Sequence, residues 1–276
     1  MGQLAQSGIG FGAQYSQDAA FFQSFPRLEV AGNRGIGYII HPISTWTLSV
    51  KKLVIAIDGP AASGKTTTAR LVAARLGYLH IDTGAMYRAV TAKVLKLNIA
   101  VGDVRRIAQL VNETRVEMRD ANGSLRVLID GEDVTQEIRS AEVTRNVSAI
   151  SSIGEVRSAM VRKQRRLAAG GGVVLEGRDI GTVVFPGADL KIFMVAGIES
   201  RARRRQQELR EKGIIVSLDK LKKEIGERDR LDSTRAQSPL KKASDAIELD
   251  TSNMTVEEQV DFVVKKAQEI IERAGA

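Results

Sequence analysis

Five stretches of the chain have the pattern of β-strands. Residues 53–57 form an unbroken apolar run, and further strand patterns follow at residues 78–82, 173–175, 188–196 and 246–250. An unbroken run is typical of a strand buried on both faces, because a strand with one wet face alternates apolar and polar positions. Helical patterns separate these stretches, which predicts an α/β fold with a parallel sheet covered by helices on both faces.

The helical stretches carry recognisable start and stop signals. Thr255 and Glu258 form a capping-box pattern, and the apolar residues that follow fall on one stripe, which predicts a final helix packed on the core. Glycine or a short polar residue marks the ends of four other expected helices: from Thr67 to a closing Gly77, from Asp103, over residues 141–152, and over residues 155–169.

Two segments depart from this alternation. Residues 114–140 contain two strand patterns around Asn122-Gly123, a dipeptide favoured in tight hairpin turns, so we expect a small accessory subdomain there. Residues 1–50 carry only four charged residues, are rich in Gly and Gln, and show no sustained periodicity. We therefore expect residues 1–50 to be a poorly ordered extension of a domain that spans residues 51–276.

Composition excludes several classes of protein. The chain has no cysteine, which rules out disulfides, thiolate catalysis and cysteine-based metal sites, and suits a reducing cytoplasm. His41 and His80, the two histidines, have no partner at metal-ligand spacing, so His80 is expected to be a packed strand-end residue. No apolar run approaches the roughly 20 residues that cross a membrane. We therefore expect a cytoplasmic protein without a membrane partner.

The net charge of +8 is concentrated in one segment. Residues 201–242 contain fourteen Lys and Arg against seven Asp and Glu, so the rest of the chain is nearly neutral. A surface that follows a nucleic-acid duplex would spread its positive charge more widely. The concentration instead favours a mobile segment that closes over phosphates, although a solvated helix face explains many of these residues individually.

A phosphate-binding loop follows the first strand. Gly59, Gly64, Lys65 and Thr66 satisfy the pattern G-x-x-x-x-G-K-[ST], with a strand before the loop and a helix after it. The glycines let backbone N–H groups turn inward, the helix N-terminus adds partial positive charge, and Lys65 supplies a mobile cation. The Thr66 hydroxyl is a candidate Mg²⁺ ligand. The predicted ATP-binding residues are Gly59, Pro60, Ala61, Ala62, Ser63, Gly64, Lys65, Thr66 and Thr67.

Several further cations are expected at the same edge of the sheet. Arg88 and Arg178 follow the ends of two strands, and Arg228 and Arg235 lie in the basic segment. One nucleoside triphosphate hardly requires so many cations, whereas two phosphorylated ligands that meet end to end do. This pattern indicates phosphoryl transfer, in which alignment and charge neutralisation provide most of the catalysis.

Four motifs, in order and correctly separated, resemble those of bacterial-type cytidylate kinases. They are GPAASGKT at residues 59–66, DTGAMYR at 82–88, EGRDIGTVVFP at 176–186, and ERD at 227–229 with Arg235. The match runs from about residue 51 to the C-terminus. The resemblance implies a P-loop nucleoside-monophosphate-kinase fold: a five-stranded parallel sheet flanked by helices, a lid at about residues 199–235, and an enlarged monophosphate-binding insert containing residues 114–140.

The resemblance also implies an activity, transfer of the ATP γ-phosphate to CMP or dCMP with Mg²⁺, and roles for individual residues. Lys65, Arg178, Arg228 and Arg235 would be catalytic. Thr83 and Arg88 would lie on the CMP side, with Arg88, Arg178 and Arg235 near its phosphate. Ser148, Arg157 and Asp179 would read the cytosine, and Asp232 the ribose. No motif indicates an obligate dimer, so we expect a monomer.

Alternatives remain open at this point. Serine and arginine are commonplace on helices, so the roles of Ser148, Arg157, Arg228 and Arg235 depend on the resemblance. Another nucleotide or small-molecule kinase on the same core is the nearest rival. A nucleic-acid-dependent ATPase would use the basic segment, yet residues 201–242 contain no aromatic side chain for base stacking. A GTPase is disfavoured because the chain has no Asn-Lys-x-Asp motif.

Overall fold

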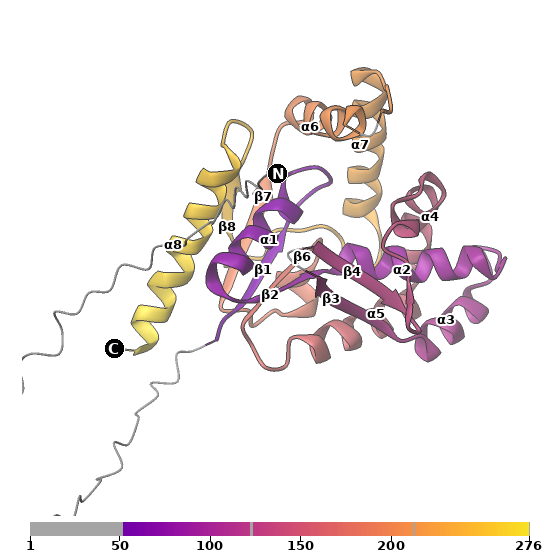
Figure 1. The fold of residues 1–276 in the computed structure, drawn as a ribbon, viewed down its shortest axis with the longest axis horizontal. Coiled ribbons are helices and arrows are strands. Elements are labelled where there is room, and N and C mark those ends of the chain that lie inside the picture. The colour runs from indigo at the N-terminus through magenta and orange to yellow at the C-terminus, as the bar shows by residue number, and fades with distance from the viewer. Residues whose placement is uncertain (1–51, 122–123, 212, 276) are drawn as a thin grey trace, which may run out of the picture. The chain divides into compact units, whose positions relative to one another are not determined.

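Five parallel strands form the central sheet of the part of the chain that the structure describes. This structure is a computed structural model, and it describes residues 52–121, 124–211 and 213–275 (Figure 1). The strands pair in the order β2-β6-β1-β7-β8. Their bounds are β1 Val54–Asp58, β2 Leu79–Asp82, β6 Val173–Gly177, β7 Leu190–Val195 and β8 Ile247–Asp250. The predicted five-stranded parallel sheet is confirmed, whereas the predicted extension, residues 1–50, lies outside the described residues.

Eight α-helices accompany the sheet within the same described ranges: α1 Lys65–Leu76, α2 Thr83–Lys96, α3 Val104–Glu113, α4 Ala141–Ser151, α5 Gly154–Leu167, α6 Ile198–Arg210, α7 Leu218–Thr234 and α8 Val256–Gly275. The Thr255 hydroxyl accepts from the Glu258 N–H and the Glu258 carboxylate accepts from the Thr255 N–H, so the predicted capping box is present. No helix among the described residues is both long enough and apolar enough to cross a bilayer.

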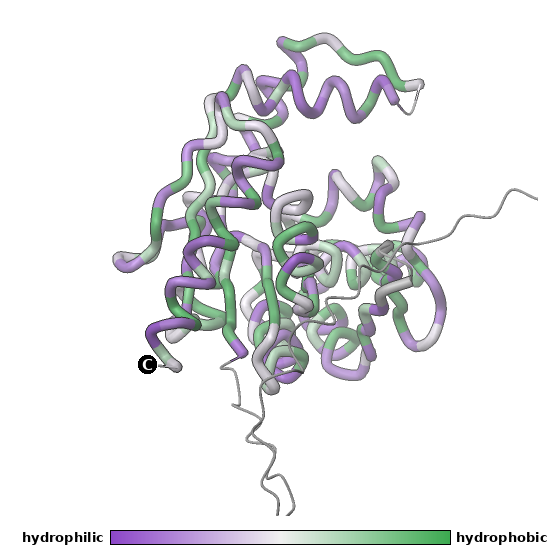
Figure 2. The backbone as a smooth tube through the Cα atoms, turned by 60° about the vertical axis from the view of Figure 1, so that its left-hand side comes forward, coloured by the Kyte–Doolittle hydropathy of each residue, from purple (hydrophilic) through white to green (hydrophobic). Residues whose placement is uncertain are grey.

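The two faces of the sheet pack against different helices because side chains alternate along each strand. Ile55 and Ile57 of β1 lie in a buried cluster with residues of α1 and α8. Ala56 lies in a second cluster with residues of α2, α4 and α5. Figure 2 shows the resulting hydrophobic strands in the middle of the fold. The expectation of helices on both faces is therefore met.

Some boundaries differ from the prediction. Helix α1 begins at Lys65, two residues before the expected Thr67, because Gly64 adopts a left-handed conformation (φ 97°) and its carbonyl accepts from the Thr68 N–H at 3.1 Å. Helix α5 ends at Leu167 rather than residue 169, before the glycine run. One turn of π-helix, η2 (Ile180–Val184), follows β6 and was not predicted.

The predicted hairpin is present between α3 and α4. Strands β3 (Val116–Ala121) and β4 (Ser124–Ile129) pair antiparallel, and a two-residue strand, β5 (Glu132–Asp133), adds to β4. The expected Asn122-Gly123 corner lies outside the described residues. Val127 and Ile129 of β4 belong to the same buried cluster as α2, so this small sheet packs on the helix that follows β2.

Helices α6 and α7 contain most of the basic segment and pack on each other with a small core of their own. Ala202, Leu221 and Ile225 form a buried cluster that is separate from the two clusters of the sheet. Ala62 of the phosphate-binding loop packs against its edge. We call α6, α7 and their connection the lid. The buried cluster of the lid therefore contacts the loop that is expected to hold ATP.

The curl of the phosphate-binding loop depends on a close approach to β7. A Cβ atom on Gly59, which has φ +153°, would lie 2.2 Å from the Met194 carbonyl oxygen. No real Cβ contact is that short, so any side chain at this position would push the loop away from β7.

We predict that Gly59→Ala lowers the free energy of unfolding by about 3 kcal/mol or more, because overpacking and backbone strain add. Gly187→Ala is the matched control, since a Cβ there has no atom within 4 Å. Urea denaturation of both variants measures the difference. Equal stabilities would contradict the close packing described for Gly59.

Candidate active site

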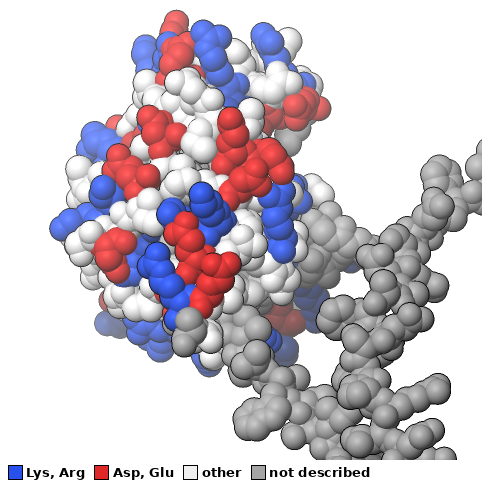
Figure 3. All heavy atoms as spheres, turned by 90° about the vertical axis from the view of Figure 1, so that its left-hand side faces the viewer, with Lys and Arg blue, Asp and Glu red and all other residues white. Residues whose placement is uncertain are grey.

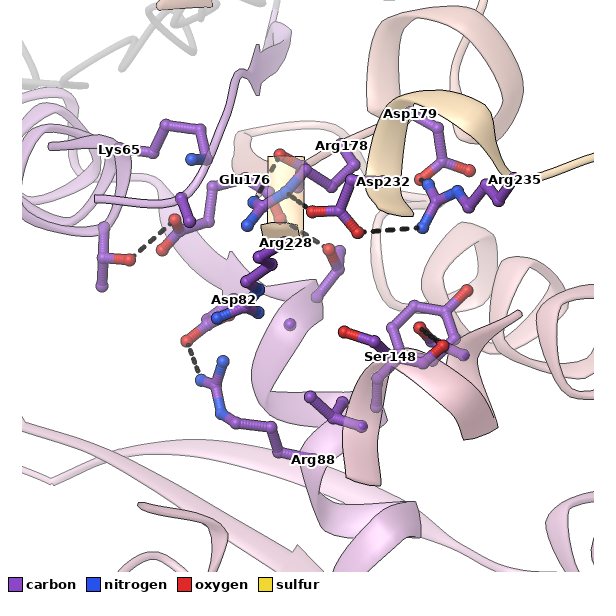
Figure 4. Close-up of a pocket in the computed structure, with 18 of the residues that line it drawn as sticks. Lys65, Asp82, Arg88, Ser148, Glu176, Arg178, Asp179, Arg228, Asp232 and Arg235 are labelled. Atoms are coloured by element: carbon purple, nitrogen blue, oxygen red, sulfur yellow. Dashed lines mark hydrogen bonds and ion pairs between the residues drawn. The ribbon is translucent and has the colours of Figure 1, made fainter. Parts of the chain in front are cut away.

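A cleft opens at the carboxyl ends of β1, β2 and β6, where ligands bind in open α/β sheets (Figure 4). Asp82 and Glu176 are register partners in the adjacent strands β2 and β6, which brings both carboxyl groups to this edge. The lid supplies Arg228 and Asp232, and the segment after it Arg235. Residues distant in sequence therefore meet because parallel strands end together.

The phosphate-binding loop forms one end of the cleft. Lys65 Nζ donates to the Pro60 carbonyl at 2.6 Å and to Ser63 Oγ at 3.3 Å, so its ammonium group is held against its own loop. Burial, reinforced by the positive charge of Arg178, lowers the pKa of Lys65 to about 7. An anion in the loop would therefore meet a lysine that is only partly protonated near neutral pH.

A chain of hydrogen bonds runs from this loop across β6 to β2. Thr66 Oγ1 donates to Glu176 Oε2 at 2.8 Å, and Glu176 Oε1 lies 3.1 Å from His80 Nε2. Thr83 Oγ1 donates to the Glu176 backbone carbonyl at 2.6 Å. His80 is thus a largely buried strand residue, as expected, but it contacts a cleft carboxylate, which the sequence did not indicate.

Arg88 projects into the cleft from the second turn of α2. Its Nη2 donates to Asp82 Oδ2 at 2.9 Å, and Asp82 also caps α2 by accepting from the Ala85 N–H at 2.8 Å. Burial acts to raise the pKa of Asp82, but Arg88 and the capping N–H outweigh burial and lower it. Asp82 is therefore ionised at neutral pH and holds Arg88 in place.

The far end of the cleft is built around Asp179. Arg157 of α5 donates to Asp179 Oδ2, and Arg235 Nη2 lies 3.8 Å from Asp179 Oδ1. The Arg157 guanidinium lies over the Tyr87 ring, 5.4 Å from its centre, a cation–π arrangement. Ser148 lines the same end from α4. This end therefore presents a carboxylate, a guanidinium and a hydroxyl on fixed elements.

Arginines occupy the middle of the cleft. Arg178 Nε donates to Asp232 Oδ2 at 2.7 Å, and Asp232 Oδ1 lies 3.8 Å from Arg235 Nη1. Burial, with Arg178 nearby, lowers the pKa of Arg228 to about 10, so Arg228 stays protonated at neutral pH. Among the described residues that line the cleft, Lys and Arg side chains outnumber Asp and Glu. The cleft is suited to binding anions.

Several basic side chains on the surface of the lid are paired with acids of the lid itself. Arg203 Nη2 lies 2.8 Å from Glu199 Oε1, and Arg230 Nη2 lies 2.7 Å from Glu227 Oε1. On the face that carries α8, Lys and Arg are interspersed with Asp and Glu (Figure 3). Local pairing of this kind is typical of a solvated helical surface and gives little support to duplex binding.

The structure brings together most of the residues singled out from the sequence. The cleft is lined by all the residues expected on the acceptor side and by part of the loop: Ala61, Ala62, Lys65, Thr66, Thr83, Arg88, Ser148, Arg157, Arg178, Asp179, Arg228, Asp232 and Arg235. The remaining loop residues, Gly59, Pro60, Ser63, Gly64 and Thr67, are not among the lining residues. Gly59 allows the loop to pack closely against β7, and Thr67 is exposed to solvent outside the cleft.

Seven of the lining residues were not selected as site residues: Asp82, Gly84, Tyr87, Val147, Ser151, Glu176 and Gly177. Among them, Asp82 and Glu176 carry carboxylates, and the Tyr87 ring lies under the Arg157 guanidinium. Asp82 ends one predicted strand and Glu176 directly follows another, which is the signal that could have identified them. Tyr87 lies in the DTGAMYR motif beside Arg88, but its position under Arg157 could not be predicted, because it depends on how α2 and α5 pack.

We predict that Asp179→Asn lowers the free energy of unfolding by about 3 kcal/mol, because Arg157 and Arg235 would lose their shared buried countercharge. Glu227→Gln, which removes an exposed partner of Arg230, is the control and should leave stability unchanged within error. Urea titrations followed by circular dichroism test both variants. An Asp179→Asn protein as stable as the original would show that the three groups are not coupled.

Comparison with known proteins identifies relatives of this chain. The family model for cytidylate kinase matches residues 55–269. Cytidylate kinase of Pelotomaculum thermopropionicum is 51% identical over 213 residues, 77% of this chain and 94% of the relative. Cytidylate kinase of Bacillus cytotoxicus is 47% identical over 223 residues, 81% of this chain and 99% of the relative. A gluconokinase structure from Sinorhizobium meliloti has a TM-score of 0.40 and 15% sequence identity to this chain, and the match covers 81% of this chain and 95% of that one. This similarity is too low to indicate a shared function. The chain belongs to the cytidylate kinase family.

Proposed function

We propose that this chain transfers the γ-phosphate of ATP to CMP or dCMP, yielding ADP and CDP or dCDP. One observation carries the proposal: a single cleft has Lys65 of the phosphate-binding loop at one end and the Arg157–Asp179 pair at the other, with Arg178 and Arg228 between them (Figure 4). Two phosphorylated ligands that enter from opposite ends would meet at the arginines.

The far end of the cleft suits cytosine. The exocyclic amine of cytosine donates hydrogen bonds, whereas its ring nitrogen and carbonyl accept them. Asp179 would accept from the amine, and Arg157 and Ser148 would donate to the acceptors. Uracil reverses the pattern, since it presents a carbonyl and a ring N–H at the corresponding positions. Asp232, which holds Arg178, would accept from the ribose, and Thr83 would contact the nucleotide on the side of α2.

The arginines would neutralise the transferring group. Phosphoryl transfer spreads negative charge over the moving oxygens, and fixed cations stabilise that charge without reorganisation. Arg88, Arg178 and Arg235 would hold the acceptor phosphate, while Arg228 and Lys65 would face the donor phosphates. The attacking group is an oxygen of the acceptor phosphate, which is already mostly ionised at neutral pH, so the site needs no strong general base.

The donor set beside the loop fits Mg²⁺. The Thr66 hydroxyl and the Glu176 carboxylate lie 2.8 Å apart, and Mg²⁺ typically takes one or two protein oxygens together with phosphate oxygens and water. Thr66 and Glu176 would hold the ion, with Glu176 orienting the Thr66 hydroxyl. When bound, Mg²⁺ would neutralise charge on the β- and γ-phosphates of ATP.

We propose that the chain acts as a monomer, since one chain supplies both the phosphate-binding loop and the residues proposed to bind the acceptor. ATP and CMP or dCMP are the partners that the cleft would take.

We predict that CMP and dCMP exceed UMP, AMP, GMP and TMP in kcat/KM by at least about 100-fold, because a mismatched base leaves buried polar groups unpaired. Coupled assays of ADP release with each monophosphate measure the ratios. A purine or uridine monophosphate as the best acceptor would identify a different nucleotide kinase, and stimulation by nucleic acid would favour the ATPase alternative.

We predict proton uptake when ATP binds. The ligand-free pKa of Lys65 is lowered to about 7, and bound phosphates would raise it again. Binding should therefore take up roughly half a proton at pH 7 and more at pH 8, and ATP affinity should weaken as the pH rises between them. Calorimetry in buffers of different ionisation enthalpy measures the uptake.

Two variants serve as controls for this prediction. Lys65→Arg keeps a permanent charge, so ATP should bind without the uptake. Lys65→Ala should lower kcat by about 10²–10³-fold, since one transition-state contact to the phosphates is lost. Uptake that persists in Lys65→Arg would assign the proton to another group.

A further inference from the structure

A buried carboxylate outside the cleft connects its two halves. Asp58 is the last residue of β1 and directly precedes Gly59 of the phosphate-binding loop; it is 5% exposed. Its Oδ1 accepts from the Ile180 N–H at 2.8 Å and its Oδ2 from the Gly181 N–H at 2.7 Å. These two N–H groups begin η2, immediately after Arg178 and Asp179.

The contact needs an ionised carboxylate. Two N–H donors face Asp58, and only a carboxylate offers an acceptor oxygen to each; an amide would turn its NH₂ group toward one of them. Burial, together with the negative charge of Asp179, raises the pKa of Asp58 to about 6, while the two N–H groups and Lys65 act in the opposite direction. At neutral pH the side chain is therefore mostly ionised.

A raised pKa means that ionised Asp58 costs folding free energy. Because the folded chain binds this proton more tightly than the unfolded chain, stability falls as the pH rises from the unfolded value toward 6. Shifted pKa values of this kind cluster at functional sites. Asp58 does not line the cleft, so it acts through the residues it holds.

We propose that Asp58 is a positioning residue that fixes Arg178 and Asp179 relative to the phosphate-binding loop, so that the two phosphates meet in line. This inference rests on the proposed function. The backbone of Asp58 leads directly into the phosphate-binding loop at Gly59. Its carboxylate holds the turn after Arg178 and Asp179, which would bind the acceptor. A displacement of about 1 Å between reacting groups costs on the order of 100-fold in rate.

The test is Asp58→Asn, characterised by kcat, by the separate affinities for ATP and CMP, and by the affinity for a bisubstrate probe in which adenosine and cytidine are joined through five phosphates. The substitution leaves the ATP-binding loop and the acceptor-binding residues each intact, so the affinities for ATP and CMP should change less than about threefold. Both kcat and the affinity for the probe should fall, kcat by about 100-fold, because only these two quantities require the loop and the acceptor-binding residues to be aligned with each other.

Asp189→Asn is the matched control. Asp189 accepts from the Val54 N–H at 2.8 Å, at the opposite end of the same strand, so the substitution also replaces a carboxylate that accepts from a backbone N–H, but away from the cleft. It should leave kcat and probe affinity unchanged.

A second variant keeps the proposal falsifiable if Asp58→Asn does not fold. A Cβ at Gly181 would lie 3.4 Å from Asp58 Oδ2 and 3.2 Å from Lys191 Cδ, so Gly181→Ala crowds the side chains of Asp58 and Lys191 without changing any charge. We expect a loss of about tenfold in kcat with unchanged KM for CMP.

Three outcomes would overturn the inference: a folded Asp58→Asn protein with kcat within threefold of the original, a loss confined to the affinity for CMP or ATP alone, or an unchanged kcat in Gly181→Ala. Failure of the unaltered chain to phosphorylate CMP would instead reject the proposed function, so the two failures are distinguishable.

Discussion

The cleft depends on holding several cations close together before any phosphate is present. Like charges repel strongly where water is scarce, so a cluster of arginines persists only when nearby carboxylates offset the repulsion. Asp82 holds Arg88, Asp232 holds Arg178, and Asp179 holds Arg157. Each pair fixes a guanidinium in a defined place. Preorganised charge of this kind is what a phosphoryl-transfer site needs, because the cost of ordering is met during folding rather than during the reaction.

Much of the fold could be predicted because its signals are local. The phosphate-binding loop, the apolar run of β1 and the Thr255–Glu258 capping box each occupy a few consecutive residues. Strand β5, with two residues, is too short to show a pattern. The π-helical turn at Ile180 could not be predicted either, because the Asp58 carboxylate that holds its first N–H groups lies 122 residues away in sequence.

The residues of the site also differ in whether a local motif or long-range packing places them. Lys65 and Thr66 could be selected from the motif that contains them, and Ser148, Arg157 and Asp232 only from the resemblance of the whole chain to a family. Glu176 was missed as a site residue because its contact with Thr66 depends on how β6 and β1 pair, which no single segment encodes. Tyr87 is a similar case: its ring meets Arg157 only when two helices from different parts of the chain pack on the same face of the sheet.

The lid has its own small core, which separates its local stability from the stability of the sheet. Ala202, Leu221 and Ile225 hold α6 against α7 without joining the large clusters on either face of the sheet. Regions with few buried apolar contacts open at lower free energy than the rest of a protein. We therefore expect substitutions among these three side chains to change the local stability of α6 and α7 more than the stability of the sheet. Selection on the two stabilities would then act at different positions in the gene.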